Sequence, residues 1–236
     1  MGLDDARRQI VALAASYARA IRSASSPEGL FAVVEGTHRE MDAIRDHVLG
    51  KSEQVLACRK GCALCCYLTP EVKAHDLTRI IDYLEARCTP RQREEIRHQA
   101  EQNVAAMEGL SHRECLSRNI RCPLLDGDDG CSCYPVRPTL CRVQHSTDVT
   151  VCESAFAAPS NLSMPGAFNK KLKILQSMVS EALELAFAKS GYDAQSYYLS
   201  HALLEGLGNV AVKKRWRKRK AVFSKAARMR ADTGDR

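Results

Sequence analysis

The 236-residue sequence predicts a mainly α-helical protein in which helices flank a cysteine-rich, loop-dominated region. Over the first and last parts of the chain, apolar residues recur every three or four positions, as they do on the buried face of a helix. Between residues 111 and 165 this period is lost, and Pro, Gly, Asp and Cys become frequent. Because strands do not alternate with helices in the sequence pattern, a parallel-sheet enzyme fold is not expected.

The N-terminal half contains four predicted helices. The first covers residues 4–22, and the other three begin at a Ser or Thr followed by Pro, which pairs an N-cap with a first-turn proline. These starts are Ser26-Pro27, Thr69-Pro70 and Thr89-Pro90. The positions expected on the inner faces are Ile10, Leu13, Ala14, Tyr17 and Ile21, then Leu30, Val34, Met41, Ile44 and Val48, then Leu77, Ile80, Ile81 and Leu84, and finally Ile96, Ala100, Val104 and Met107.

Two further helices are predicted after the loop region, over residues 166–190 and 193–207. Their inward-facing positions are Phe168, Leu172, Leu175, Val179, Leu183 and Ala186 in the first, and Tyr197, Leu203, Leu204 and Leu207 in the second. The chain therefore divides into N-terminal helices, a cysteine-cluster metal-binding domain with two internal helices, C-terminal helices and a basic tail. The predicted bounds of these four segments are 1–50, 51–160, 161–212 and 213–236.

The sequence pattern favours a cytoplasmic protein. The N-terminal residues are acidic and do not form a signal peptide, and no stretch is long and apolar enough to span a bilayer. Cytoplasmic reductants keep thiols free, and the odd number of cysteines, 11, argues against a closed disulfide framework. With 45% hydrophobic residues the chain can bury a core unaided, so a metal would organise one region or take part in chemistry.

Eight of the 11 cysteines fall into two groups with the spacing of metal ligands. Spacings of two or three residues let one turn of backbone present two sulfurs to the same ion, and the thiolate is the form that binds. Cys65 and Cys66 are adjacent, and because neighbouring side chains diverge, they favour two ions or a cluster. Eight thiolates would fill two four-cysteine sites, or one iron–sulfur cluster and a second site. The candidate ligands are Cys58, Cys62, Cys65 and Cys66 in the first group and Cys122, Cys131, Cys141 and Cys152 in the second.

Four other residues near these groups are weaker candidates. Cys88 and Cys115 are isolated and are expected to be small buried residues, whereas Cys133 fits either that role or the role of a ligand. His145 is a further candidate ligand, although a lone His near cysteines is more often not one. The acidic stretch 126–130 lacks the register of a calcium-binding EF-hand and is expected to be a solvated turn.

The order of the motifs carries a family resemblance. Cys58-x3-Cys62-x2-Cys65-Cys66 precedes Leu68-Thr69-Pro70-Glu71-Val72, and Cys122-Pro123-Leu124-Leu125 precedes a short acidic turn, Cys131, Tyr134, Arg137-Pro138 and Cys141-Arg142. Together they resemble the CxxCxxCC cysteine-cluster family, described as a zinc- or iron-chelating domain, although the first gap here is one residue longer than that name states. The resemblance covers residues 55–155. It implies a metal site at seven of the eight candidate ligands, with Cys152 as the eighth, and implies little about a reaction.

Enzymatic alternatives remain open at this point. The spacing from Cys58 to Cys65 is also that of radical S-adenosylmethionine enzymes, but their motif follows a strand, and here it follows a predicted helix. Because the resembling family includes flagellin lysine N-methylases, a protein-lysine N-methylase that uses S-adenosylmethionine and a protein substrate is an alternative function. No glycine-rich strand-to-helix turn marks a cofactor site, and no residue is singled out as catalytic.

A third hypothesis comes from the basic C-terminal region. The net charge is +7, and residues 213–220 contain seven cations in eight positions. Such a run attracts polyanions through counterion release, and Trp216 could stack on a base or rest at a membrane interface. The protein could thus be the zinc module of a nucleic-acid binder that makes contact through Lys213 to Lys220, whereas the simpler interpretation is a solvated basic tail.

Overall fold

The computed structural model describes residues 3–228, so residues 1–2 and the end of the predicted basic tail, 229–236, lie outside the described residues. The described chain is mostly helical, which confirms the predicted fold class. Its α-helices are α1 (Leu3–Ser23), α2 (Pro27–Leu49), α3 (Ala74–Arg87), α4 (Pro90–Met107), α5 (His112–Leu116), α6 (Thr139–Val143), α7 (Val149–Ala157), α8 (Lys170–Lys189), α9 (Leu199–Gly206) and α10 (Val210–Arg217). Two 3₁₀ turns, η1 (Leu64–Tyr67) and η2 (Tyr134–Val136), and two strands, β1 (Glu71–Lys73) and β2 (Ser196–Tyr198), complete the elements.

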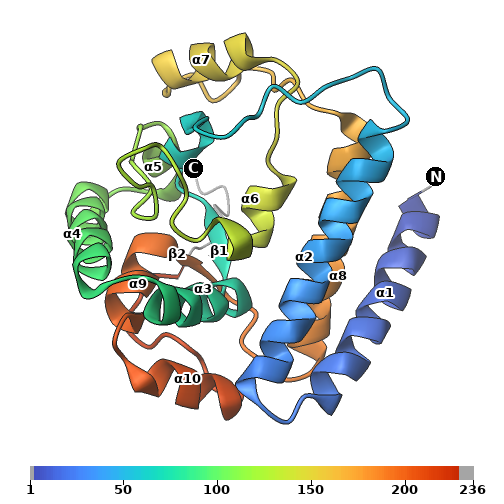
Figure 1. The fold of residues 1–236 in the computed structure, drawn as a ribbon, viewed down its shortest axis with the longest axis vertical. Helices are drawn as coiled ribbons and strands as arrows, with labels where there is room; N and C mark the ends of the chain where they lie inside the picture. Colours follow the sequence, from blue (N-terminus) through green and yellow to red (C-terminus); the bar gives the residue numbers. More distant parts are fainter. Residues whose placement is uncertain (1–2, 229–236) are drawn as a thin grey trace.

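Helices α1, α2 and α8 lie side by side and form the long edge of the molecule (Figure 1). The start of α2 is as predicted, because the Ser26 hydroxyl accepts a hydrogen bond from the Gly29 amide at 3.2 Å and Pro27 occupies the first turn. Asn169 caps α8 in the same way, through the Leu172 amide at 2.9 Å. Alanines and branched residues fill the space between the three helices, so this bundle buries its core without any cysteine.

In a second group of helices, α3 and α9 contact the two strands, α4 packs on α9, and α10 packs on α2 and α3 (Figure 1). The start of α4 is also as predicted. The Thr89 hydroxyl accepts from the Gln92 amide at 3.3 Å, and the Gln92 side chain accepts from the Thr89 amide at 2.9 Å, which together form a capping box.

The predicted helix start at Thr69-Pro70 is wrong. Residues Glu71–Lys73 form strand β1, which pairs antiparallel with β2, and α3 begins only at Ala74. Val72 lies opposite Tyr197 in this pairing, and both side chains are fully buried. The expectation that Tyr197 lies on a helix is wrong for the same reason: burial against a distant segment outweighs the local pattern.

The region between residues 111 and 165 is not devoid of helices, although helical periodicity is lost there. It holds α5, η2, α6 and α7, none longer than nine residues. Elements of one or two turns are too short to show a repeating apolar face, which is why the sequence predicts only loops.

The start of the predicted basic tail is a packed helix. Trp216 in α10 is 1% exposed, and its ring centroid lies 5.3 Å from that of Phe187 and 5.0 Å from that of Tyr192. The prediction that this ring could stack on a base or rest at a membrane interface is wrong, because the ring is part of the core. Lys213 pairs with Asp82 at 2.7 Å and Arg215 pairs with Glu205 at 2.7 Å, so two cations of the run are already paired.

Within the described range, no helix has the length and apolar character needed to cross a membrane.

Candidate metal centre

The first cysteine group lies on an irregular segment between α2 and β1 that ends in η1. Gly61 has φ of +82°, a backbone conformation that favours glycine, and the Cys62 amide donates to the Arg59 carbonyl at 3.0 Å across the resulting turn. The turn places Cys62 shortly before η1, which carries both Cys65 and Cys66.

The second cysteine group is joined to the first through the main chain. The Cys122 amide donates to the Cys66 carbonyl at 2.7 Å, and the Ile120 amide donates to the Tyr67 carbonyl at 3.1 Å. Helices α3 and α4 separate these segments in sequence, yet the two hydrogen bonds bring them side by side. The segments that carry the predicted ligands Cys66 and Cys122 are therefore neighbours in the fold.

The acidic stretch 126–130 forms a turn that leads to Cys131. Asp126 accepts hydrogen bonds through its carboxylate from the amides of Asp128, at 3.0 Å, and Gly130, at 2.7 Å. A bridge between Leu125 and Cys131 closes the turn. The Asp126 carboxylate is thus engaged by its own backbone, as the interpretation of this stretch as a turn expects.

Cys141 lies in α6, which is held by a buried carboxylate of α3. The Asp76 side chain accepts from the Thr139 amide at 2.8 Å and from the Thr139 hydroxyl at 2.9 Å. His38 Nε2 of α2 lies 3.5 Å from the same carboxylate. Since all three side chains are buried, the position of Cys141 is fixed by contacts with α2 and α3.

The positive charge of Arg137 acts on one thiol of each cysteine group, Cys65 and Cys131. Its guanidinium lies 4.2 Å from the centroid of the Tyr134 ring. The hydrogen bond between the Cys65 and Cys66 thiols, assisted by the charge of Arg137, holds the pKa of Cys65 below its usual range. The contact between Cys131 and Cys133, again with Arg137, lowers the pKa of Cys131. Arg137 therefore favours the thiolate form, which is the form that binds a metal.

Two thiols of the second group lie in apolar surroundings that favour their neutral form. Burial raises the pKa of Cys122 to about 12, and burial together with the neighbouring thiols raises the pKa of Cys141 well above its usual range. A cation that binds beside them would supply the positive charge that their deprotonation requires. Metal binding at these two thiols would therefore release protons.

Cys58, Cys62 and Cys152 form the outer part of the cluster. Cys58 Sγ accepts from the Ser146 amide at 3.3 Å, and Cys58 lies within electrostatic range of both Cys62 and Cys152. Helix α7, which carries Cys152, packs on η1 through an edge-to-face contact between Phe156 and Tyr67, with ring centroids 5.1 Å apart. The structure thus brings the last predicted ligand near the first ones.

The donor atoms of this cluster are all sulfur, which suits zinc or thiolate-bound iron. All 11 cysteines are free thiols. Across residues 3–228, no three His, Cys, Asp or Glu side chains converge closely enough to mark a metal-binding group by geometry. The eight candidate ligands are neighbours by backbone placement, and the fit to a metal rests on the chemistry of the donors.

The remaining candidates have other surroundings. His145 Nδ1 faces the Val143 carbonyl at 2.9 Å, and Nε2 accepts from the Asn169 amide at 3.2 Å, so both ring nitrogens are engaged in a structural link to α8. Cys88 follows α3 and Cys115 lies within α5, and the charged groups that act on their thiols are Arg93 for Cys88 and Arg118 and Glu114 for Cys115. The thiol of Cys133, in contrast, lies 3.7 Å from that of Cys131.

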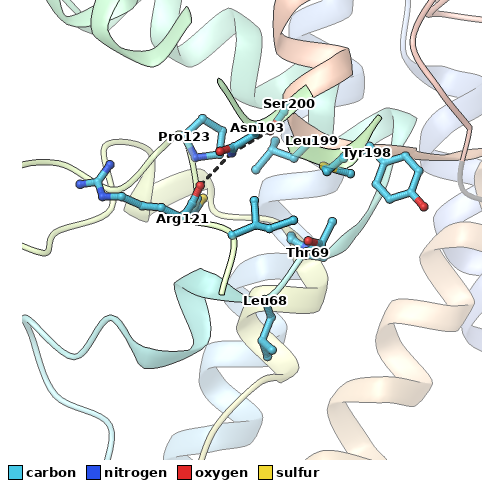
Figure 2. A pocket seen from close by; sticks show the side chains of 12 residues that line it. Leu68, Thr69, Asn103, Arg121, Pro123, Tyr198, Leu199 and Ser200 are labelled. Atoms are coloured by element: carbon cyan, nitrogen blue, oxygen red, sulfur yellow. Dashed lines mark hydrogen bonds between the residues drawn. The ribbon is translucent and has the colours of Figure 1, made fainter. Parts of the chain in front are cut away.

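A small cavity of about 10 Å³ is lined by Thr69, Asn103 and Ser200 (Figure 2), and Cys122 is also part of its lining. Asn103 of α4 spans its wall, where its side-chain amide donates to the Arg121 carbonyl at 2.8 Å and to the Ser200 hydroxyl at 3.1 Å (Figure 2). A space of this size holds one water molecule at most. The cavity is therefore too small for a substrate. The hydrogen bonds of Asn103 hold the backbone of Arg121, which directly precedes Cys122.

Comparison with known proteins gives one match. Residues 57–163 match the CxxCxxCC family, whose description is "Putative zinc- or iron-chelating domain". The matched range contains all eight candidate ligands. No curated protein and no solved structure matches the chain.

Proposed function

Because residues 57–163 match the CxxCxxCC family, we propose that this protein binds zinc or iron through cysteine thiolates. The proposed ligands are Cys58, Cys62, Cys65, Cys66, Cys122, Cys131, Cys141 and Cys152. The observation that carries this proposal is the 2.7 Å hydrogen bond from the Cys122 amide to the Cys66 carbonyl. It joins two thiol-rich segments that are far apart in the sequence.

The protein's own residues would prepare this site in three ways. Arg137 lowers the charge cost of placing several thiolates together. Asp76 holds the helix that carries Cys141, and the Ser146 amide donates to the Cys58 sulfur. When bound, zinc would supply a closed tetrahedral structural centre, and iron would supply a redox centre.

The test is the metal and acid-labile sulfide content of the full chain purified without oxygen. We expect zinc, or iron, in the wild-type protein and a loss of at least half of it in Cys66→Ser and Cys122→Ser. Cys88→Ser, which removes a thiol outside both groups, is the matched control and should keep the wild-type content. Equal metal content in all four proteins would contradict the proposal.

The same preparation also addresses the iron–sulfur and enzymatic alternatives. Iron with acid-labile sulfide and brown colour would favour an iron–sulfur centre, and S-adenosylmethionine-dependent methylation of a protein lysine should then be lost in Cys62→Ser or Cys65→Ser. Colourless zinc would favour a structural or metal-handling role. The nucleic-acid hypothesis expects salt-sensitive binding that disappears when Lys213 to Lys220 are neutralised.

A further inference from the structure

We propose that Cys133 is a ninth metal-binding thiolate, which chelates the same ion as Cys131. This inference rests on the proposed metal-binding function. The pair has the spacing Cys-x-Cys, and neither the family pattern in the sequence nor the eight predicted ligands include Cys133.

The distance between the two sulfurs carries the inference. Cys131 Sγ and Cys133 Sγ lie 3.7 Å apart. Two thiolates on one tetrahedral zinc ion, each at about 2.3 Å from the metal, are separated by about 3.8 Å. The pair is therefore already spaced to chelate a single ion.

The backbone on both sides of the pair is held in place. The Ser132 amide donates to the Leu124 carbonyl at 2.8 Å, and Cys131 pairs with Leu125 in an isolated bridge. After the pair, the Val136 amide donates to the Cys133 carbonyl at 2.8 Å as η2 begins. Both thiols are thus set on the same side by main-chain contacts that do not depend on a metal.

The surroundings of Cys133 are those of a ligand in the second cysteine group. Its side chain is 0% exposed, and it lies within electrostatic range of the thiols of Cys122 and Cys141. Cys115 is equally buried, at 1% exposed, but it lies in α5, where the charged groups that act on its thiol are Arg118 and Glu114. The burial of Cys133 therefore places it among thiols, whereas the burial of Cys115 does not.

With Cys133 included, residues 122–141 supply four thiols, Cys122, Cys131, Cys133 and Cys141, that a bound ion would draw together around the Cys131–Cys133 pair. Such a set suits a divalent ion in tetrahedral coordination. Cys66, whose carbonyl accepts a hydrogen bond from the Cys122 amide, lies within electrostatic range of Cys122 and Cys141 and could bridge to a second ion.

The experiment is a titration of the full chain with Zn²⁺ and with Co²⁺, whose ultraviolet charge-transfer absorbance grows with the number of bound thiolates. In Cys133→Ala we expect the affinity of the tightest site to fall more than about 100-fold, beyond the loss typical of a residue that only supports a ligand. The Co²⁺ charge-transfer absorbance should also decrease. Cys115→Ala, which removes a thiol of matching burial, should bind both metals as the wild type does.

A second measurement on the wild-type protein covers the case in which Cys133→Ala fails to fold. The ¹³Cβ resonance of Cys133 should shift with that of Cys131 when Zn²⁺ is added, while that of Cys115 stays in place. An unshifted Cys133 resonance, or unchanged affinity and Co²⁺ absorbance in Cys133→Ala, would overturn this inference alone. Absence of metal binding by the wild-type protein would overturn the proposed function as well.

Discussion

Asp76 of α3 links three helices, because its carboxylate contacts residues of α2 and α6. It is 2% exposed and accepts two hydrogen bonds from Thr139 while facing His38 of α2. A buried carboxylate is costly unless its lone pairs are engaged, and here partners from two other helices engage them. The residue that holds α6 is therefore far in sequence from the cysteine that α6 presents.

Removal of Asp76 should lower stability and disturb the metal site together. We expect Asp76→Ala to reduce the free energy of unfolding by about 3–5 kcal/mol, because His38 and the Thr139 amide lose a buried partner. Asp46→Ala, which breaks an exposed pair with Arg45, should cost less than about 1 kcal/mol. Urea unfolding of the two variants checks this difference, and equal losses would contradict it.

The contribution of Asp76 should also depend on pH. Burial alone would raise the pKa of Asp76, but the hydrogen bond to His38, the nearby His75 and the Thr139 amide outweigh it, so the pKa lies below its ordinary value. The unfolded chain takes up this proton near pH 3.9, at higher pH than the folded protein does. The stability gap between the wild type and Asp76→Ala should therefore be constant above about pH 5 and shrink below about pH 4. A gap that widens in acid would contradict the assignment.

The sequence predicts some residue roles at the site and misses others. Eight thiols are recognisable because short spacing between cysteines is chemically informative by itself. Cys133 is ambiguous in the sequence, because only the folded turn shows that its sulfur meets that of Cys131. Asp76 and Asn103 could not be ranked above other polar residues, since their partners lie on distant segments.

At the scale of elements, α10 shows how a charged stretch can contribute to a core. Its cations occupy the outer faces, while Val212 and Trp216 point inward. Glu205 of α9 holds the chain that follows: its carboxylate accepts from Arg215 and from the backbone amides of residues 224–226. The C-terminal segment is therefore anchored by both apolar and ionic contacts.

Trp216, the single tryptophan of the chain, should report on this anchoring. We expect a blue-shifted fluorescence emission in the native protein and a red shift on unfolding, because the ring is enclosed by Phe187 and Tyr192. Trp216→Ala should cost about 3–5 kcal/mol, as the loss of a large core side chain does. Lys214→Ala, on the exposed face of the same helix, should be nearly neutral in the same unfolding assay. Native emission typical of an exposed indole would contradict the packing.

Helix starts could be predicted where the signal is local and could not where it is not. Ser26 and Thr89 cap their own helices, so the few residues around them contain the whole cause. Thr69-Pro70 carries the same letters but precedes a strand, because Val72 pairs with Tyr197 of β2. A pairing across that separation leaves no trace in a window of a dozen residues.

At the scale of the whole molecule, the bundle of α1, α2 and α8 makes its contacts without cysteines, although Leu124, Cys133 and Val136 join the same buried core. The helices α1, α2 and α8 contain no cysteine and bury one another, so the fold class followed from apolar periodicity alone. The arrangement of the cysteine segments depends instead on two main-chain hydrogen bonds near η1, which periodicity does not encode. The relative placement of the two cysteine segments could therefore not be predicted from the sequence pattern.

Metal removal should therefore loosen one region and leave the rest folded. We expect a chelator to preserve most of the far-ultraviolet circular dichroism while it lowers the melting temperature. Metal at 100 times its dissociation constant should add about 2.7 kcal/mol of stability by mass action. Amide exchange should accelerate at residues 58–66 and 122–141 but not in α8. Loss of most helical signal on chelation would contradict this separation.

The hydrogen bond between Cys122 and Cys66 can form only after both segments have been synthesised, which has a consequence for folding during synthesis. Its two sides leave the ribosome at different times, with α3 and α4 synthesised between them. The first cysteine segment is therefore synthesised before the second, and its thiols lack their partners until α3 and α4 have been made and have packed. Loading of the proposed metal site would then be a late step of maturation, and a chain that stalls before it would keep its first four cysteines exposed to oxidants.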